Sequence, residues 1–297
     1  MIERDKPWRG IMVATALPMR EDLSVDLDAY GEHCRWLVDN GCDGVVPNGS
    51  LGEYQTLTEQ ERISVMETAV QAVGGQNVMA GAGAYGSGES RRWAERARDA
   101  GCGSILLLPP NAYRADERAV IEHYREVAKA GVPIVAYNNP YDTKVDLTPA
   151  LLAKLYEEGL VVGVKEFTGD PRRAYEIAEL APGLDVLIGS DDALLELALA
   201  GAVGWIAGYP NALPVSNAAL YHAALAHDLE TALPLYRKLH PLLRWDARTE
   251  FVQAIKLSME IVGRPAGPCR APRLPLTDEM AAAVRAATEK ALAEGLR

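Results

Sequence analysis

Short apolar runs recur along the first two thirds of the chain, and stretches with the period of a helix separate them. A continuous apolar run is typical of a strand that is buried on both faces. The apolar runs occupy residues 11–17, 44–47, 77–82, 104–110, 133–137, 161–165, 185–189 and 202–208. The amphipathic stretches occupy residues 26–40, 58–73, 88–100, 116–130, 148–157, 171–180 and 191–200. Strands that alternate with helices in this way predict a parallel sheet.

Residues with a preference for helix ends lie at the borders of these amphipathic stretches. Thr58 with Glu61 three places later has the sequence of a capping box, and Thr148 is followed by Pro149, which suits a first helical turn. Glycines follow six stretches, as is common where helices end. They are Gly41, Gly74, Gly101, Gly131, Gly159 and Gly201.

Eight strand–helix units within residues 1–213 favour a (β/α)8 TIM barrel. A doubly wound open sheet shares the alternation and is the alternative. After Gly208 the strand-like runs stop, and residues 214–297 predict a C-terminal helical region. Its helices are expected at 215–245, 248–262 and 277–294, with a proline-rich segment, 263–276, before the last one.

Composition excludes several classes of partner. The chain has 297 residues, which suits one large domain or a domain with an appendage, and its formal net charge of −11 argues against binding to nucleic acid or to anionic membranes. No apolar run approaches the length of a membrane span, and the first ten residues lack the apolar core of a signal peptide. The four cysteines have neither CxxC nor metal-site spacing, so we expect a cytoplasmic protein without a metal.

Lys165 is the first candidate for chemistry, because it closes the apolar run 161–165. A buried amine tends to lose its proton, and a neutral amine is a nucleophile that can form an imine with a ketone. Taken alone, these five residues favour a lysine that extends from a strand end to solvent, and the rest of the chain reverses that preference.

Polar groups follow several other predicted strands. Gly49, Ser50 and Leu51 follow the second strand, Tyr137 ends the fifth, and the sequence Gly-Ser-Asp-Asp at 189–192 ends the seventh. Because the carboxyl ends of barrel strands meet at one face, we expect these groups to lie around Lys165. We interpret Asp191 and Asp192 as helix-start carboxylates, and Glu53 in the loop after the second strand as structural.

Five segments in a fixed order carry a family resemblance: GSLGE (49–53), YNNP (137–140), GVKEFTG (163–169), GSDD (189–192) and GWIAG (204–208). Over about residues 8–295 the chain resembles the dihydrodipicolinate synthase / N-acetylneuraminate lyase family of class I pyruvate-dependent aldolases. The resemblance implies a lysine Schiff-base lyase that acts on a 2-oxo acid, forms a homotetramer, and uses no metal and no organic cofactor.

The resemblance also implies roles for single residues. It makes Lys165 the Schiff-base lysine, Tyr137 the phenol that moves protons, and Ser50 the hydroxyl partner in the proton relay. The backbone N–H groups of Ser50 and Leu51, in a turn that begins at Gly49, match those that hold the substrate carboxylate. Ile206 matches the residue whose backbone carbonyl faces the lysine.

The chain departs from the synthase pattern at three places. Leu51 replaces a second threonine, and Asp142 occupies the position of the arginine that binds the carboxylate of the aldehyde substrate. A carboxylate cannot pair with another carboxylate at neutral pH. The relay tyrosine of the synthase corresponds to Ala112, and the adjacent Tyr113 is the candidate to replace it after a local shift.

These departures favour a catabolic member of the family over the synthase itself. Candidate substrates are a 2-keto-3-deoxy sugar acid, for an aldolase or dehydratase, and 1-pyrroline-4-hydroxy-2-carboxylate, for a deaminase. Authentic 4-hydroxy-tetrahydrodipicolinate synthase is the alternative within the family. A non-catalytic regulator that binds a 2-oxo acid is an alternative of another class. A nicotinamide oxidoreductase that uses the glycines at 81, 83 and 86 is the least favoured, because no acidic residue follows at a suitable strand end.

Overall fold

Eight parallel strands form the centre of the protein. In the computed structural model, which describes residues 6–297, they make one sheet in the order β2-β1-β8-β7-β6-β5-β4-β3. A parallel bridge between Val45 and Val78 joins β2 to the residue before β3, so the two ends of the sheet meet. The strands are β1 (Gly10–Ala14), β2 (Gly44–Val46), β3 (Met79–Gly81), β4 (Ser104–Leu107), β5 (Ile134–Asn138), β6 (Gly163–Glu166), β7 (Asp185–Ile188) and β8 (Gly204–Ala207). The predicted TIM barrel is confirmed, and the open-sheet alternative is wrong.

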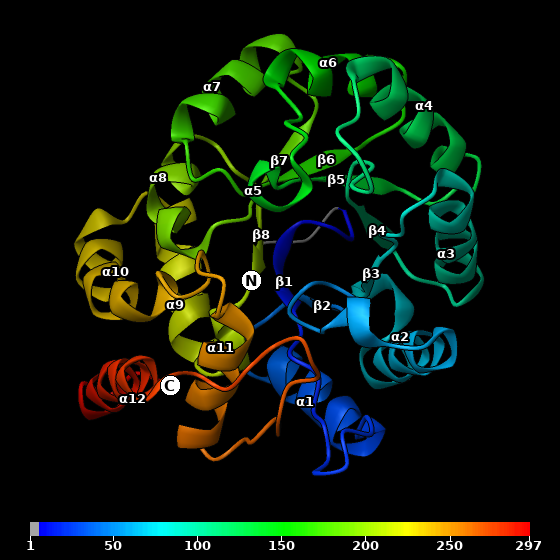
Figure 1. Cartoon of the computed structure of the whole chain (residues 1–297). Coiled ribbons are helices and arrows are strands. Elements are labelled where there is room, and N and C mark those ends of the chain that lie inside the picture. The colour runs from blue at the N-terminus through cyan, green and yellow to red at the C-terminus, as the bar shows by residue number, and fades with distance from the viewer. Residues whose placement is uncertain (1–5) are drawn as a thin grey trace.

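Helices surround the barrel, and further helices extend the chain beyond it (Figure 1). The α-helices are α1 (Leu27–Asp39), α2 (Glu59–Val73), α3 (Ser87–Asp99), α4 (Glu117–Ala128), α5 (Pro140–Thr143), α6 (Pro149–Glu157), α7 (Pro171–Leu180), α8 (Leu194–Leu199), α9 (Pro214–Leu225), α10 (Leu229–Leu243), α11 (Phe251–Ile261) and α12 (Asp278–Ala293). Short 3-10 helices are η1 (Tyr54–Thr56), η2 (Gly75–Asn77), η3 (Asp191–Ala193) and η4 (Tyr209–Asn211).

The predicted helix-end signals operate as expected. Thr58 and Glu61 form a reciprocal capping box at the start of α2. Thr148 caps α6, and Pro149 is its first residue. All six glycines predicted to end helices have positive φ angles, a backbone conformation that glycine adopts without steric cost.

The C-terminal helical region contains one helix more than predicted. The expected helix over residues 215–245 is divided into α9 and α10 at His227, whose φ of 57° cannot continue a right-handed helix. Asp228 then caps α10 by accepting a hydrogen bond from the backbone of Thr231. The apolar pattern alone did not reveal this break, because the pattern resumes directly after it.

Two apolar clusters stabilise the barrel. The inner cluster fills the strand interior with Trp8, Met12, Val46, Met79, Leu106, Val135, Tyr137, Leu187 and Ile206. The larger cluster lies between the strands and the helices and includes side chains from the C-terminal helices. Tyr221 of α9, for example, stacks on Trp205 of β8. The barrel and the helical region therefore share a core, while a boundary at residues 213 and 214 stays a prediction.

The composition also led to predictions about membrane spans, metal sites and a signal peptide. Within residues 6–297, no helix is both long and apolar enough to cross a membrane. The same part of the chain contains no group of three or more His, Cys, Asp or Glu side chains placed to hold a metal ion. The prediction that no signal peptide is present concerned the first ten residues. Residues 1–5 lie outside the described residues.

Candidate active site

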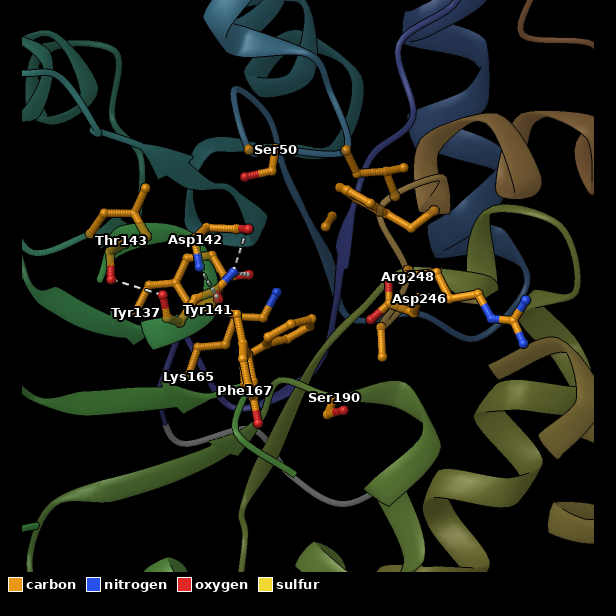
Figure 2. A pocket seen from close by; sticks show the side chains of 18 of the residues that line it. Ser50, Tyr137, Tyr141, Asp142, Thr143, Lys165, Phe167, Ser190, Asp246 and Arg248 are labelled. Atoms are coloured by element: carbon orange, nitrogen blue, oxygen red, sulfur yellow. Dashed lines mark hydrogen bonds between the residues drawn. The ribbon is translucent and has the colours of Figure 1, made fainter. Parts of the chain in front are cut away.

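A cavity of about 940 Å³ lies at the barrel mouth, where the strands end (Figure 2). Of the residues predicted for the site, five line this cavity: Gly49, Ser50, Leu51, Tyr137 and Lys165. Figure 2 shows Lys165 and Tyr137 side by side, with Ser50 on another part of the wall. The carboxyl ends of parallel barrel strands lie at one face of the barrel. The predicted site residues at these strand ends therefore lie around one cavity.

Tyr137 and Lys165 are direct partners in the register of β5 and β6. Their side chains point into the barrel, and the Lys165 Nζ atom lies 4.4 Å from the centroid of the Tyr137 ring. Both strands run one residue further than predicted, to Asn138 and Glu166. Since successive side chains of a strand alternate, these last two residues face outward, where Asn138 donates to the Glu166 carboxylate at 3.0 Å.

The Lys165 side chain is only 6% exposed. Burial lowers the pKa of its amine, and the carboxyl groups of Asp246 and Asp191 oppose that shift in pKa when they are ionised. No ion pair among the described residues includes Lys165, so no adjacent carboxylate holds the amine in its charged form. The site thus favours the neutral, nucleophilic amine that the sequence predicted.

Tyr137 is buried beside this amine. Burial raises the pKa of the phenol above its usual value, and an ionised Asp246 raises it further, so the hydroxyl stays protonated at neutral pH. Asn139 donates its side-chain N–H to the Tyr137 oxygen across 3.5 Å, and the Phe167 ring packs edge-on against the Tyr137 ring. The Ser50 and Tyr137 hydroxyls are not hydrogen-bonded to each other in the described chain, so a relay between them stays a prediction.

Contacts of Glu53 anchor the loop that carries Ser50. Glu53 has a left-handed φ of 53°, and its buried carboxylate accepts from Lys256 Nζ and from the backbone N–H of Arg270, each at 2.9 Å. A side chain at Gly81 would lie 2.1 Å from the Asn48 carbonyl oxygen, so the loop packs directly on β3. The structural interpretation of Glu53 is confirmed.

Asp191 organises the loop after β8. Its carboxylate accepts from the Trp205 indole at 2.9 Å and from the backbone N–H groups of Gly208 and Tyr209 at 3.0 and 2.9 Å. Burial raises the pKa of this carboxyl to about 6. Asp191 therefore has a structural role, as expected, although its partners are strand β8 and its loop and not the backbone of a following helix.

Asp246 is a residue of the cavity that the sequence patterns did not predict. This residue lies between α10 and α11, in the region predicted as an appendage, yet it lines the same cavity as Lys165 (Figure 2). Its side chain is buried, and burial together with the charge of Asp191 raises the pKa of its carboxyl well above the usual value. Arg248 and Arg273 of the C-terminal region also line the cavity. No local motif marks these three positions.

With this geometry described, comparison with known proteins identifies the family. Residues 7–291 match the dihydrodipicolinate synthetase family. The chain belongs to this family. Members form a Schiff base through a lysine, so the chain is a class I lyase.

Named relatives and solved structures agree with this assignment. A 4-hydroxy-tetrahydrodipicolinate synthase of Methanothrix thermoacetophila is 34% identical over 281 residues, which cover 94% of this chain and 95% of the relative. The corresponding synthase of Symbiobacterium thermophilum is 33% identical, with coverage of 93% and 95%. The crystal structure of dihydrodipicolinate synthase from Aquifex aeolicus is 30% identical, covers 95% of this chain and 98% of its own, and has a TM-score of 0.90.

Two residues assigned by the resemblance lie elsewhere than on the cavity wall. Tyr113 is 64% exposed and lines a separate groove beside α5, so the structure does not bring it to Lys165. Asn111 of the same loop lines the cavity instead. Ile206 belongs to the inner barrel cluster, and its register partner in β1 is Met12. The orientation of its carbonyl toward the lysine stays a prediction.

Proposed function

We propose that this member of the dihydrodipicolinate synthetase family is a Schiff-base lyase or hydro-lyase that acts on a 2-oxo acid, by pyruvate-type aldol cleavage or condensation or by dehydration or deamination of a related substrate. The observation that carries the proposal is the buried Lys165 amine, which lies beside the Tyr137 phenol at the mouth of the barrel. Because burial favours the neutral amine, Lys165 can attack the C2 carbonyl of a 2-oxo acid.

The protonated imine that results is an electron sink, so a proton or a carbon–carbon bond next to it becomes labile. Tyr137 is placed to return and accept protons at that carbon, because its hydroxyl is protonated and lies in the same cavity. The turn at Gly49, Ser50 and Leu51 supplies backbone N–H groups for the substrate carboxylate, as the family resemblance implies.

Asp142 argues for a substrate without a second carboxylate at this position. The Asp142 side chain lines the cavity and accepts a hydrogen bond from Asn139 at 2.8 Å. A fixed carboxylate attracts hydroxyl or N–H groups and repels an aldehyde that carries its own carboxylate. This supports a 2-keto-3-deoxy sugar acid or 1-pyrroline-4-hydroxy-2-carboxylate as substrate.

Authentic 4-hydroxy-tetrahydrodipicolinate synthase is the second candidate, because the relatives named above carry that name. We further propose a homotetramer in the cytoplasm, on the basis of the family resemblance. Light scattering of the purified protein tests the assembly: a mass of four chains supports the proposal, and a mass of one chain contradicts it.

Borohydride reduction in the presence of 2-oxo acids tests the function. Incubation with pyruvate, 2-keto-3-deoxy sugar acids or 1-pyrroline-4-hydroxy-2-carboxylate, followed by reduction and peptide mass analysis, should add the substrate mass to Lys165. A turnover panel then measures pyruvate, ammonia and semialdehyde release. Efficient condensation of pyruvate with aspartate semialdehyde, without turnover of the other compounds, would favour the synthase. An adduct or a thermal shift without any turnover would favour a regulator.

A further inference from the structure

Asp246 places a carboxyl group in the cavity from a part of the chain that is far from the barrel strands in sequence. It follows α10 and precedes α11, and it belongs to none of the five segments that carry the family resemblance. Its side chain is 8% exposed and lines the cavity together with Lys165 and Tyr137. Figure 2 shows Asp246 and Lys165 extending into the cavity from different sides.

Close packing fixes the position of this carboxyl group. A Cβ atom at Gly208, directly after β8, would lie 2.4 Å from Asp246 Oδ1 and 3.2 Å from its Cγ. The carboxyl group thus occupies space that a side chain at position 208 would need. The backbone N–H of Asp246 donates to the Leu243 carbonyl at 3.0 Å, which anchors the residue to the end of α10.

The charges around Asp246 favour its protonated form. None of the ion pairs among residues 6–297 includes Asp246, and Asp191 and Asp192 are neighbouring acidic groups. Burial and the Asp191 charge raise the pKa of Asp246, whereas the charge of Lys165 acts in the opposite direction. Since burial also lowers the pKa of Lys165, the two groups together favour a neutral carboxylic acid and a neutral amine.

We propose that Asp246 is a catalytic acid for imine formation in this enzyme, a role that rests on the Schiff-base function proposed above. Lys165 Nζ attacks C2 of the 2-oxo acid and, after proton transfer to the former carbonyl oxygen, gives a neutral carbinolamine. Asp246 donates its proton to the carbinolamine hydroxyl, the C2–O bond breaks, and water leaves. The nitrogen lone pair forms the C=N bond, so the products are a protonated imine, a carboxylate on Asp246 and one water molecule.

The arrangement of the two groups suits this step. Lys165 and Asp246 face the same cavity without forming an ion pair, so a substrate carbon can lie between them. The carboxylate left on Asp246 then stabilises the positive imine through space. Hydrolysis of the product imine reverses the step, with the carboxylate as the base that activates water. Tyr137 remains available for proton transfer at C3.

Asp246→Asn in the full-length enzyme tests the proposal, because an amide keeps the shape of the side chain and cannot transfer a proton. The readout is the rate of borohydride-trapped adduct on Lys165 with pyruvate, at several pH values. General acids contribute roughly 10²–10⁴-fold, so the trapping rate should fall by about 10²-fold or more while the final adduct still forms on Lys165. In the wild type the rate should decline as rising pH deprotonates Asp246, and this decline should be absent in the variant.

Glu196→Gln is the matched control, since it removes another carboxylate from the cavity wall, one that accepts a hydrogen bond from Tyr236. Its trapping rate should stay close to that of the wild type. Gly208→Ala should slow trapping as Asp246→Asn does, because the methyl group displaces the carboxyl group. A rate for Asp246→Asn equal to the wild-type rate overturns the proposal, and so does an equal loss in Glu196→Gln.

Asp246→Ala with added formate tests whether slower trapping comes from the loss of a proton donor or from a change in structure. Formate should restore part of the trapping rate, and chloride at equal ionic strength should not. Absence of rescue, with a folded variant shown by an unchanged thermal midpoint, contradicts the catalytic role. Failure of the Schiff-base function itself gives a different result, because the wild type then forms no adduct with pyruvate or any other 2-oxo acid tested.

Discussion

The Lys165 amine lies against the face of the Tyr137 ring, with Nζ 4.4 Å from the ring centroid, because the two residues are partners in adjacent strands. The ring has two effects on the amine. It helps to bury the amine, and burial is the largest cause of the lowered pKa of Lys165. Its π-face attracts positive charge at that place, including the charge that the protonated imine later carries. A single pair of residues thus supports both the nucleophile and the intermediate.

Lys165→Ala should abolish adduct formation and lower turnover to the background rate. The change removes the only amine in the cavity among the residues that line it, and the remaining side chains cannot form an imine. Borohydride trapping followed by mass spectrometry checks the result. Lys154→Ala serves as control, because this exposed lysine pairs with Glu117 on the helical surface. Full activity in Lys165→Ala would refute the Schiff-base mechanism.

Tyr137→Phe should retain the fold and lose proton transfer. Within residues 6–297 the hydroxyl has only a long hydrogen bond from Asn139, so its removal leaves little unsatisfied in the core. Loss of a positioned acid–base group should lower kcat by about 10²–10⁴-fold with an unchanged thermal midpoint. Tyr175→Phe, on the exposed surface of α7, should have wild-type kcat. Wild-type kcat in Tyr137→Phe would assign proton transfer to another group.

The acid side of the pH profile should report the Lys165 amine. Burial lowers its pKa, and only the deprotonated form attacks, so trapping should accelerate as pH rises through that lowered pKa. The acceleration should end below about pH 10.4, where an ordinary exposed lysine deprotonates, and the decline caused by deprotonation of Asp246 should follow at higher pH. Stopped-flow or quenched trapping from pH 5 to about pH 10, with Nα-acetyl-lysine as the reference amine, measures this difference. An inflection at the reference value would show that burial does not activate Lys165.

Local patterns were sufficient to predict the barrel and most of its mouth. Apolar runs gave the strands because each strand is buried on both faces, and strand ends meet at one face by geometry. The patterns misplaced the ends of β5 and β6 by one residue. Asn138 and Glu166 are polar, so they resemble loop residues in sequence, although they satisfy each other by hydrogen bonding within the structure.

The positions of Asp246 and Tyr113 could not be predicted from local sequence, because they depend on contacts between distant parts of the chain. The approach of Asp246 to Gly208 depends on how α10 and α11 fold back over the barrel, and no short segment encodes that path. The outward position of Tyr113 similarly depends on the conformation of the loop after β4. Sequence resemblance assigns a residue to a loop, whereas a side-chain direction requires coordinates.

Asp142→Arg should shift substrate preference toward an aldehyde that carries a carboxylate. The substitution replaces a repelling charge on the cavity wall with a donor, and a charge-assisted hydrogen bond of about 1.5–3 kcal/mol corresponds to about tenfold or more in kcat/KM. The comparison is condensation of pyruvate with aspartate semialdehyde, relative to the best substrate of the panel. Asp142→Asn separates loss of repulsion from gain of attraction. Efficient condensation by the wild type, with no gain in Asp142→Arg, would favour authentic synthase activity.

Lys256→Met should destabilise the protein through the loop that carries Ser50. Lys256 of α11 is the ion-pair partner of Glu53, and both side chains are buried. Its removal leaves a buried carboxylate without a counter-charge, which costs about 3–5 kcal/mol in free energy of unfolding. Denaturant or thermal unfolding measures the loss, and a higher KM for the 2-oxo acid should accompany it.

Two further variants decide whether the ion pair causes that loss. The double variant Lys256→Met with Glu53→Gln removes both charges, so it should be more stable than the single variant. Lys290→Met removes a surface lysine that contacts Glu294 at 4.0 Å, and exposed pairs contribute about 0–1 kcal/mol. If Lys256→Met loses no more stability than Lys290→Met, the buried pair does not hold the loop, and the backbone hydrogen bond from Arg270 to Glu53 is sufficient.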